Sequence, residues 1–181
     1  MADQKISNMP AASTLTGAEL LAGVQSGANV KVTVDQVSAA ALATKACFSA
    51  CPLANQAGIA TATFTKLNMD TELFDVGGYY DTTNKRWTPP AGKVRMSARM
   101  LVGAGVAASA GALLMLYKNG LRFRDATPGY AIAANDAACE GSWVVDANGT
   151  DYFEAYAIIT TASTATVLGT AQLSRFEGEQ I

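Results

Sequence analysis

The chain has 181 residues, half of them hydrophobic, and a formal net charge of -2. This length holds one domain with a sizeable core plus an appendage, and the apolar content argues against disorder throughout. The small negative charge and the lack of a long basic run argue against nucleic acid as the main partner, because phosphate binding needs clustered cations.

The first residues, Met1 to Lys5, lead into a polar segment, which predicts no secretory signal peptide. The longest apolar stretch, Met100 to Tyr117, is rich in small residues and interrupted by glycines, so it favours a loop between strands over a membrane span. We therefore expect a soluble protein without membrane insertion.

The N-terminal part reads as its own module. Two short apolar-rich segments, Glu19 to Gln25 and Ala28 to Thr33, are joined by Ser26-Gly27, which predicts a hairpin. Gln36 follows Thr33 at capping-box spacing and opens an Ala-rich helix candidate. A module this small rarely has a sufficient core, so we expect it to pack on another protein surface or on sister chains.

The next residues are predicted to join two modules. Residues 46–60 contain Pro52, Gly58 and several small side chains, a composition typical of a linker. The predicted organisation is a segment over 1–45, a linker over 46–60 and a head domain over 61–181. Three cysteines, Cys47, Cys51 and Cys139, are too few to staple such a domain and are expected as free thiols.

The clearest strand runs from Lys93 to Met100. Val94, Met96, Ala98 and Met100 alternate with polar residues, so one side packs and the other meets water. The polar side carries the one directional charge feature, a candidate surface for an anionic partner formed by Lys93, Arg95 and Arg99. The alternative is an ordinary solvated strand face.

More strands with tight turns follow. Ala112 to Lys118 is followed by Asn119-Gly120, the signal for a type I′ turn. The returning strand is expected to turn Leu121 and Phe123 inward and its two arginines, Arg122 and Arg124, outward. Other strands are expected over 142–145, 150–160, 165–168 and 174–180, with a turn at Asn148-Gly149. Many short strands without intervening helices predict a mainly β protein, an antiparallel jelly-roll sandwich.

From Phe64 onward the order of motifs resembles the globular head of complement and tumour-necrosis-factor-like (TNF-like) proteins. The motifs are Asn68, Tyr80-Asp81, Trp87 ahead of Pro89-Pro90-Ala91-Gly92, Leu116 to Gly120, and Phe176-Glu177-Gly178. Little can be aligned from Leu121 to Trp143. The resemblance implies a jelly roll that forms a homotrimer around aromatic and apolar residues. The interface candidates are Tyr79, Tyr80, Tyr152, Phe153 and Tyr156, with monomer core as the alternative for each.

The N-terminal segment, Lys5 to Val37, carries a second resemblance. It is similar to the segment that opens many tail-fibre and related virion proteins of tailed bacteriophages, where it lies at the end nearest the particle. The resemblance implies virion docking here, by Ile6, Pro10, Leu15, Thr16, Gly17, Glu19, Leu20, Gln25, Gly27, Thr33 and Gln36.

Residues for catalysis are scarce. The sequence has no histidine, which excludes a Ser-His-Asp triad, a Cys-His pair and an imidazole metal site. Carboxylate pairs such as Asp75 with Asp81, or Asp146 with Asp151, could serve a glycosidase or hold calcium, but Asp is also common in turns. We expect no enzyme activity, cofactor or metal.

Three function classes remain. The first is a bacteriophage virion structural protein, a homotrimer that contacts other virion proteins of the capsid or tail. It would act as a capsid decoration, head fibre or short fibre, or alternatively as a tail fibre or receptor-binding protein that attaches to a host surface glycan. The others are a complement-like binding module outside any phage and a polysaccharide-degrading enzyme. No long repeat separates the docking segment from the head, which favours a short fibre or decoration made in the host cytoplasm and carried on the virion.

Overall fold

The structure is a computed structural model, and it describes residues 20–25, 28–33, 45–103, 111–130, 137–162 and 164–181. The chain divides into two compact units, Met1–Thr44 and Lys45–Ile181. Every regular element in the described ranges is a strand. Within these ranges there is no helix with the length and apolar character needed to cross a membrane.

The first unit contains the predicted hairpin. Strands β1 (Leu20–Gln25) and β2 (Ala28–Thr33) pair antiparallel, from Leu20 opposite Thr33 to Gln25 opposite Ala28. The hairpin prediction is therefore confirmed. The helix predicted after Thr33 lies outside the described residues.

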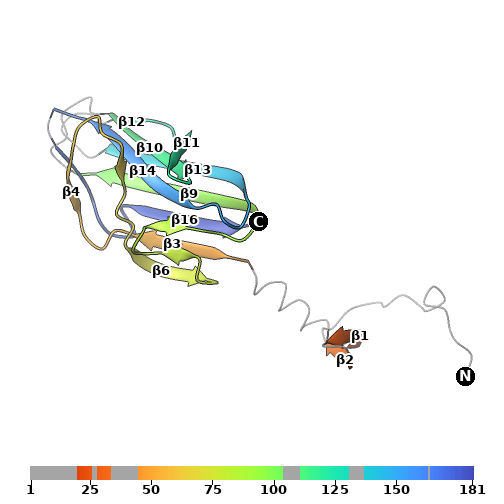
Figure 1. The fold of residues 1–181 in the computed structure, drawn as a ribbon. Coiled ribbons are helices and arrows are strands. Elements are labelled where there is room, and N and C mark those ends of the chain that lie inside the picture. Colours follow the sequence, from red (N-terminus) through yellow and green to blue (C-terminus); the bar gives the residue numbers. More distant parts are fainter. Residues whose placement is uncertain (1–19, 26–27, 34–44, 104–110, 131–136, 163) are drawn as a thin grey trace, which may run out of the picture. The chain divides into compact units, whose positions relative to one another are not determined.

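The second unit is a sandwich of two seven-stranded antiparallel sheets (Figure 1). In the first sheet β13, β9, β16, β3 and β6 lie side by side, with β13 and β6 on the outside. Strand β15 also pairs with the end of β9, and β4 pairs with β15 as a further edge strand. The strands of this sheet are β3 (Cys47–Cys51), β4 (Gln56–Ile59), β6 (Thr71–Val76), β9 (Gly92–Val102), β13 (Ala137–Ala147), β15 (Ala165–Val167) and β16 (Arg175–Gln180).

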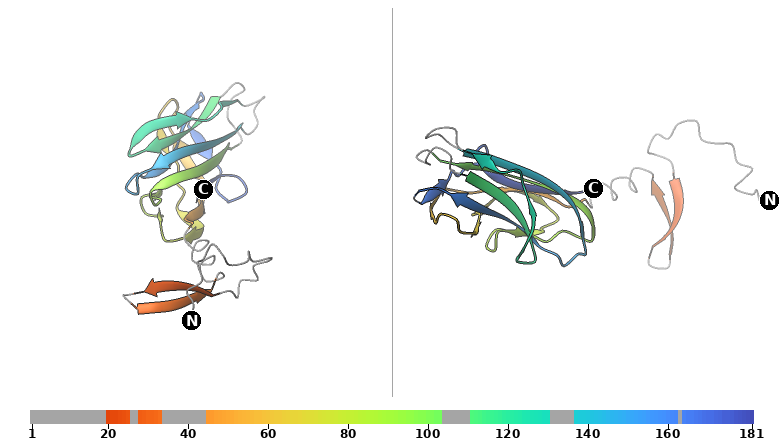
Figure 2. Two further views of the ribbon diagram at one scale, coloured as in Figure 1. Left: turned by 90° about the vertical axis from the view of Figure 1, so that its right-hand side faces the viewer. Right: turned by 90° about the horizontal axis from the view of Figure 1, so that it is seen from above.

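The second sheet has the order β11-β10-β14-β8-β7, with β12 beside β10 and β5 beside β14. Figure 2 shows the two layers from two further sides. The strands of this sheet are β5 (Thr65–Lys66), β7 (Tyr80–Asp81), β8 (Arg86–Trp87), β10 (Gly111–Lys118), β11 (Leu121–Asp125), β12 (Gly129–Tyr130) and β14 (Phe153–Thr160).

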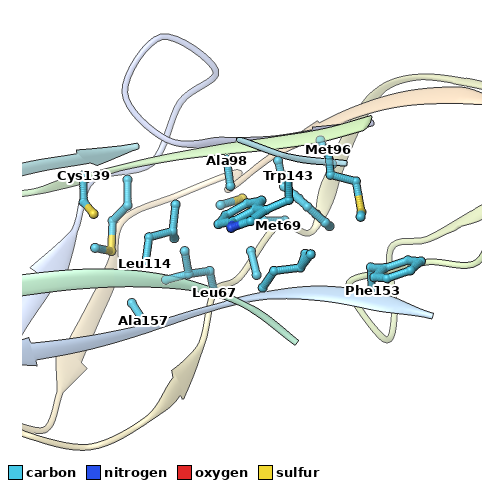
Figure 3. Packing of buried hydrophobic residues seen from close by; sticks show 14 of the residues in the cluster. Leu67, Met69, Met96, Ala98, Leu114, Cys139, Trp143, Phe153 and Ala157 are labelled. Carbon is cyan, nitrogen blue, oxygen red and sulfur yellow. The ribbon is translucent and has the colours of Figure 1, made fainter. Parts of the chain in front are cut away.

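The core lies between the two sheets and follows the strand alternation. The inner side chains of β9 at Val94, Met96 and Met100 have no exposed surface, as the sequence predicted. They face inner residues of the second sheet, among them Leu114 and Phe153 (Figure 3). Alternate residues of a strand point to opposite faces, so the same alternation fixes which side chains reach the outer surface.

The predicted linker over 46–60 is wrong, because these residues belong to the sandwich. Strand β3 lies between β16 and β6, and its Phe48 is only 1% exposed. The Phe48 ring stacks on Tyr80 at 4.7 Å and meets Phe176 edge-on at 5.0 Å. The boundary between the units falls instead between Thr44 and Lys45. Small side chains here mark a closely packed central strand.

Two tight turns are tied together by one buried carboxylate. Asn119 and Gly120 have φ angles of 54° and 77°, as the predicted type I′ turn requires. Asp151 accepts hydrogen bonds from Asn119 Nδ2 at 2.8 Å and from Asn148 N at 3.0 Å, and Lys118 Nζ lies 2.9 Å from it. The turn of the second sheet is thereby joined to the Asn148 turn that enters β14.

Candidate functional site

The outer face of the first sheet is charged, and its cations face acids on neighbouring strands. Lys93 lies opposite Asp146 and Arg99 opposite Glu140 in the register of β9 and β13. We call this surface the charged face; it comprises Lys93, Arg95, Ser97 and Arg99 on β9, Arg175, Glu177 and Glu179 on β16, and Glu140 and Asp146 on β13.

The pairing bears on the anionic-partner hypothesis for Lys93, Arg95 and Arg99. The Lys93–Asp146, Arg95–Glu179 and Arg99–Glu140 pairs have N–O distances of 3.5, 3.0 and 3.3 Å. Each cation that would bind an anion therefore already has an acid beside it. The hypothesis stays a prediction, but the face lacks the excess positive charge that would attract an anionic glycan.

A hollow of about 320 Å³ lies on the charged face, toward β6. Its lining includes the small residues Ser97 and Gly178 together with the larger side chains of Phe74, Arg95 and Glu179. A hollow with an apolar ring and small polar residues in its lining suits a protruding side chain of another protein surface.

The outer face of the second sheet has a different composition. Its rings come from alternate positions that point away from the core. We call this surface the tyrosine face; it comprises Leu113, Met115 and Tyr117 on β10, Tyr156 and Ile158 on β14, and Tyr152 just before β14. The rings of Tyr117 and Tyr156 stack at 3.8 Å with an interplanar angle of 16°.

Apolar packing continues beneath these rings. Met115 has no exposed surface, yet it lies on the outer side of β10, directly opposite Tyr156. It is not part of the core cluster between the sheets. Burial raises the pKa of the Tyr156 hydroxyl, and the neighbouring Glu154 carboxylate raises it further. The tyrosine face thus has a thin packed layer of its own.

Ion pairs are set among the rings. Lys66 contacts the carboxylate of Glu154, a residue only 5% exposed. Arg122 Nε donates to Asp125 Oδ1 at 2.8 Å, while its guanidinium lies 5.4 Å from the ring centre of Phe64. The hydrogen bond from Arg122 lowers the pKa of Asp125.

Exposed apolar side chains also gather at two edges of the sandwich. The β11 edge carries Leu121, Phe123 and Val144, which are 74%, 42% and 46% exposed. The β6 edge carries four others, each more than a third exposed: Leu73, Phe74, Val76 and Tyr79.

The inward orientation predicted for Leu121 and Phe123 is wrong. All five residues of β11 are exposed, and the pairing of β10 with β11 shifts register between Leu116 and Tyr117. A bulge on an edge strand breaks the simple alternation and turns the strand away from the core. Arg124 is also exposed, as predicted, and Arg122 lies opposite Tyr117 of the tyrosine face, with its guanidinium over the Phe64 ring.

The five trimer-interface candidates do not form one surface. Tyr80 and Phe153 are 7% and 0% exposed in the core, so the interface prediction is wrong for them and the alternative of monomer core holds. The Tyr80 hydroxyl donates to Met69 O at 2.6 Å. Tyr79 lies at the β6 edge, whereas Tyr152 and Tyr156 lie on the tyrosine face.

Few of the proposed docking residues lie in the described ranges. Leu20 and Gln25 are in β1 and Thr33 ends β2. Their docking role stays a prediction. The others fall outside the described residues: Ile6, Pro10, Leu15, Thr16, Gly17, Glu19, Gly27 and Gln36.

The carboxylates considered for catalysis have local partners. Asp75 Oδ2 accepts from Tyr80 N at 2.7 Å, and Asp81 accepts from Asn84 N at 2.8 Å. Asp146 pairs with a lysine on β9, and Asp151 holds the two turns described above. These contacts are those of turn and strand stabilisation.

Comparisons with known proteins bear on the fold. No family model and no curated protein matches the sequence. Solved structures do match: murine APRIL, with 9% identity, covers 76% of this chain and 99% of its own at a TM-score of 0.54. The globular domain of zebrafish complement 1qA, with 11% identity, covers 75% of this chain and 97% of its own at a TM-score of 0.51. Eiger TNF from S. frugiperda, with 9% identity, covers 76% and 91% at a TM-score of 0.52.

At these identities the likeness concerns the fold alone. The chain has a TNF-like antiparallel jelly-roll sandwich, and the fold predicted from the sequence is confirmed. The sequence did not reveal the tyrosine face. On β14 both sets of alternate positions are largely apolar, Phe153, Ala155 and Ala157 on one side and Tyr156 and Ile158 on the other. One feature of the sequence could have indicated this surface: the alternate positions of β14 that point outward contain tyrosine, whereas those that point inward do not.

Proposed function

We propose that this chain is a homotrimeric structural protein of a tailed-bacteriophage particle. Its N-terminal unit docks to the virion, and its jelly-roll head is displayed as a capsid decoration, head fibre or short fibre. The observation that supports this most strongly is the combination of a separate N-terminal hairpin unit, within a segment similar to phage tail-fibre openings, with a TNF-like head.

The two apolar edges support self-association. They are different surfaces at different edge strands, β11 with β13 and β6, so one can contact the other only on a second copy. Such heterologous contacts form a closed ring when the rotation between subunits closes. The hollow beside Phe74 on the charged face offers a place for a protruding residue of the β11 edge, such as Phe123. Three copies form the ring in this proposal.

Sedimentation equilibrium tests the trimer. The full chain should give three times its mass of 18.7 kDa. The Phe123→Asp variant should dissociate at micromolar concentration, because a charge would enter an apolar contact. Leu53→Asp is the matched control, since Leu53 is 76% exposed in the turn after β3 and is not one of the residues that form the two apolar edges. A clean monomer of the unaltered chain would rule out the trimer.

A truncation tests docking separately. A fragment beginning at Lys45 keeps β3 and should fold and associate as the full chain does, yet no longer join particles. A fragment beginning at Thr61 should fail to fold, because it lacks the central strand β3. Incorporation of the Lys45 fragment at the level of the full chain would contradict the docking role.

Deleting the protein separates decoration from host attachment. Decoration predicts unchanged adsorption to host cells and lower survival of particles on heating or chelation. A tail-fibre or receptor-binding role predicts the reverse. We favour decoration, since the cations that would bind an anionic host glycan are paired with acids.

A further inference from the structure

The tyrosine face ends in a hollow of about 390 Å³. This volume lies within the range of small-ligand sites, about 300 to 1,000 Å³. Leu113, Pro128, Tyr130, Ile158 and Thr160 line it, so its walls are mostly apolar with a few hydroxyls.

The position of Tyr130 depends on β10. Tyr130 pairs with Gly111 across the two strands and is 67% exposed. A Cβ atom at residue 111 would lie 3.5 Å from Tyr130 Cε1, an ordinary van der Waals contact, so the Tyr130 ring lies close to the backbone of Gly111. An exposed ring at the mouth of an apolar hollow is typical of a binding position.

The rings continue from the hollow along the strands. Ile158 lies opposite Leu113, and Tyr156 lies two residues further along β14. Tyr152 and Tyr156 are four residues apart on one side of the chain, a separation of about 13 Å at the usual rise of a strand. A ligand that contacts both the hollow and these rings must be extended.

The charges on this face indicate a neutral ligand. Among the described residues, its three cations are each beside an acid: Lys66 with Glu154, Arg122 with Asp125, and Arg86 with Asp81. The Arg86 guanidinium also lies 4.8 Å from the ring centre of Tyr152. The face thus combines flat apolar rings with fixed polar groups and no excess of either charge.

We propose that the tyrosine face binds a neutral oligosaccharide. A sugar ring has C–H bonds on its faces and hydroxyls around its rim, so it can pack on a tyrosine and hydrogen-bond beside it. A second protein is the competing occupant, and the sedimentation measurement described below separates it from a glycan. The site does not depend on the edge contacts proposed for the trimer.

The full chain, incubated on an array of neutral and acidic glycans, provides the first test. At least one neutral oligosaccharide should bind, and calorimetry with it should give the same affinity at low and high salt, because no net charge is involved. Binding to acidic glycans alone, affinity that falls steeply with salt, or no binding to any neutral glycan would overturn the proposal.

Variants locate the site. Tyr130→Ala and Tyr156→Ala should each weaken binding about tenfold or more, equivalent to the loss of one stacked ring. Tyr156→Phe keeps the ring and should bind nearly as the unaltered chain does. The control, Leu53→Ala, changes an exposed apolar residue elsewhere and should bind normally.

Tyr156→Ala could also loosen Met115, so melting curves accompany each variant, and the highly exposed Tyr130 gives a test that does not disturb packing. Unchanged binding in both alanine variants would place the glycan elsewhere and overturn the proposal. A changed sedimentation mass in these variants without any glycan binding would show a contact between copies, which would also overturn it.

Discussion

The two outer faces of the sandwich are built on the same strand alternation but differ in how they meet water. On the charged face, the Arg95–Glu179 pair is more than half exposed at both side chains. On the tyrosine face, the Glu154 side chain of the Lys66–Glu154 pair is 7% exposed, and Met115 is completely covered. The first face is a solvated strand surface, whereas the second carries a packed layer. Equivalent substitutions on the two faces should therefore have unequal effects.

The largest effect should come from placing a charge on the inner side of β9. This strand has the core on its inner side and the charged face on its outer side. Met96→Asp puts an unpaired charge among fully buried side chains and should cost several kcal/mol or prevent folding. Arg95→Ser, on the outer side of the same strand, should change the free energy of unfolding by roughly 0.5 kcal/mol or less. Thermal melting of both variants checks this, and equal melting temperatures would mean that the faces are assigned wrongly.

The next prediction concerns the packed layer of the tyrosine face. Met115→Ala should lower the free energy of unfolding by about 2 to 4 kcal/mol, because it leaves a cavity beneath Tyr156. Ser97→Ala at the matching outer position of β9 should change it by about 0.5 kcal/mol or less. Urea titration measures both. If Met115→Ala were as mild as Ser97→Ala, the tyrosine face would be an ordinary solvated surface.

How much of the fold could be predicted from the sequence depends on how strongly alternate residues of a strand differ in polarity. In β9 apolar and charged residues alternate, so the strand and its two faces were predicted correctly. The turn after β10 was predicted from the Asn119-Gly120 dipeptide itself. In β3 the small residues of Cys47–Cys51 look like a linker, although they fit a central strand packed between β16 and β6. Composition alone does not distinguish these two cases.

The candidate surfaces were less predictable than the fold. The cation positions Lys93, Arg95 and Arg99 were found, but their acid partners come from β13 and β16, far away in the sequence. The tyrosine face needs the pairing of β10 with β14 before its rings come together. Long-range register, which one sequence does not display, decides both surfaces.

A third prediction compares ion pairs on the two faces. Glu154→Ala should destabilise the protein by about 1 to 3 kcal/mol, because it leaves a partly buried lysine unpaired. Glu179→Ala breaks an exposed pair with Arg95 and should cost about 0 to 1 kcal/mol. Both variants are measured by urea unfolding at low and high salt. Only the Glu179 variant should approach the stability of the unaltered chain as salt rises. A larger loss of stability for Glu179→Ala than for Glu154→Ala would contradict the description of the two faces.

The smallest effect is expected where the two sheets are tied together, at Asp151. Burial alone would raise the pKa of Asp151, but hydrogen bonds from Lys118, Asn119 and the backbone of Asn148 outweigh it and lower the pKa below its usual value. The stabilisation is therefore complete above the unfolded-state pKa of about 3.9 and is lost as the pH falls through the lower folded-state pKa.

Asp151→Asn should cost about 1 to 2 kcal/mol at neutral pH, the worth of hydrogen bonds to a charged group. The difference from the unaltered chain should shrink as the pH falls below about 4, since protonated aspartic acid resembles asparagine in charge and shape. Asp146→Asn is the matched control, because the Asp146 side chain is 80% exposed in its pair with Lys93. Urea unfolding across this pH range checks the result. A constant difference for Asp151→Asn would show that its carboxylate charge is not what holds the two turns together.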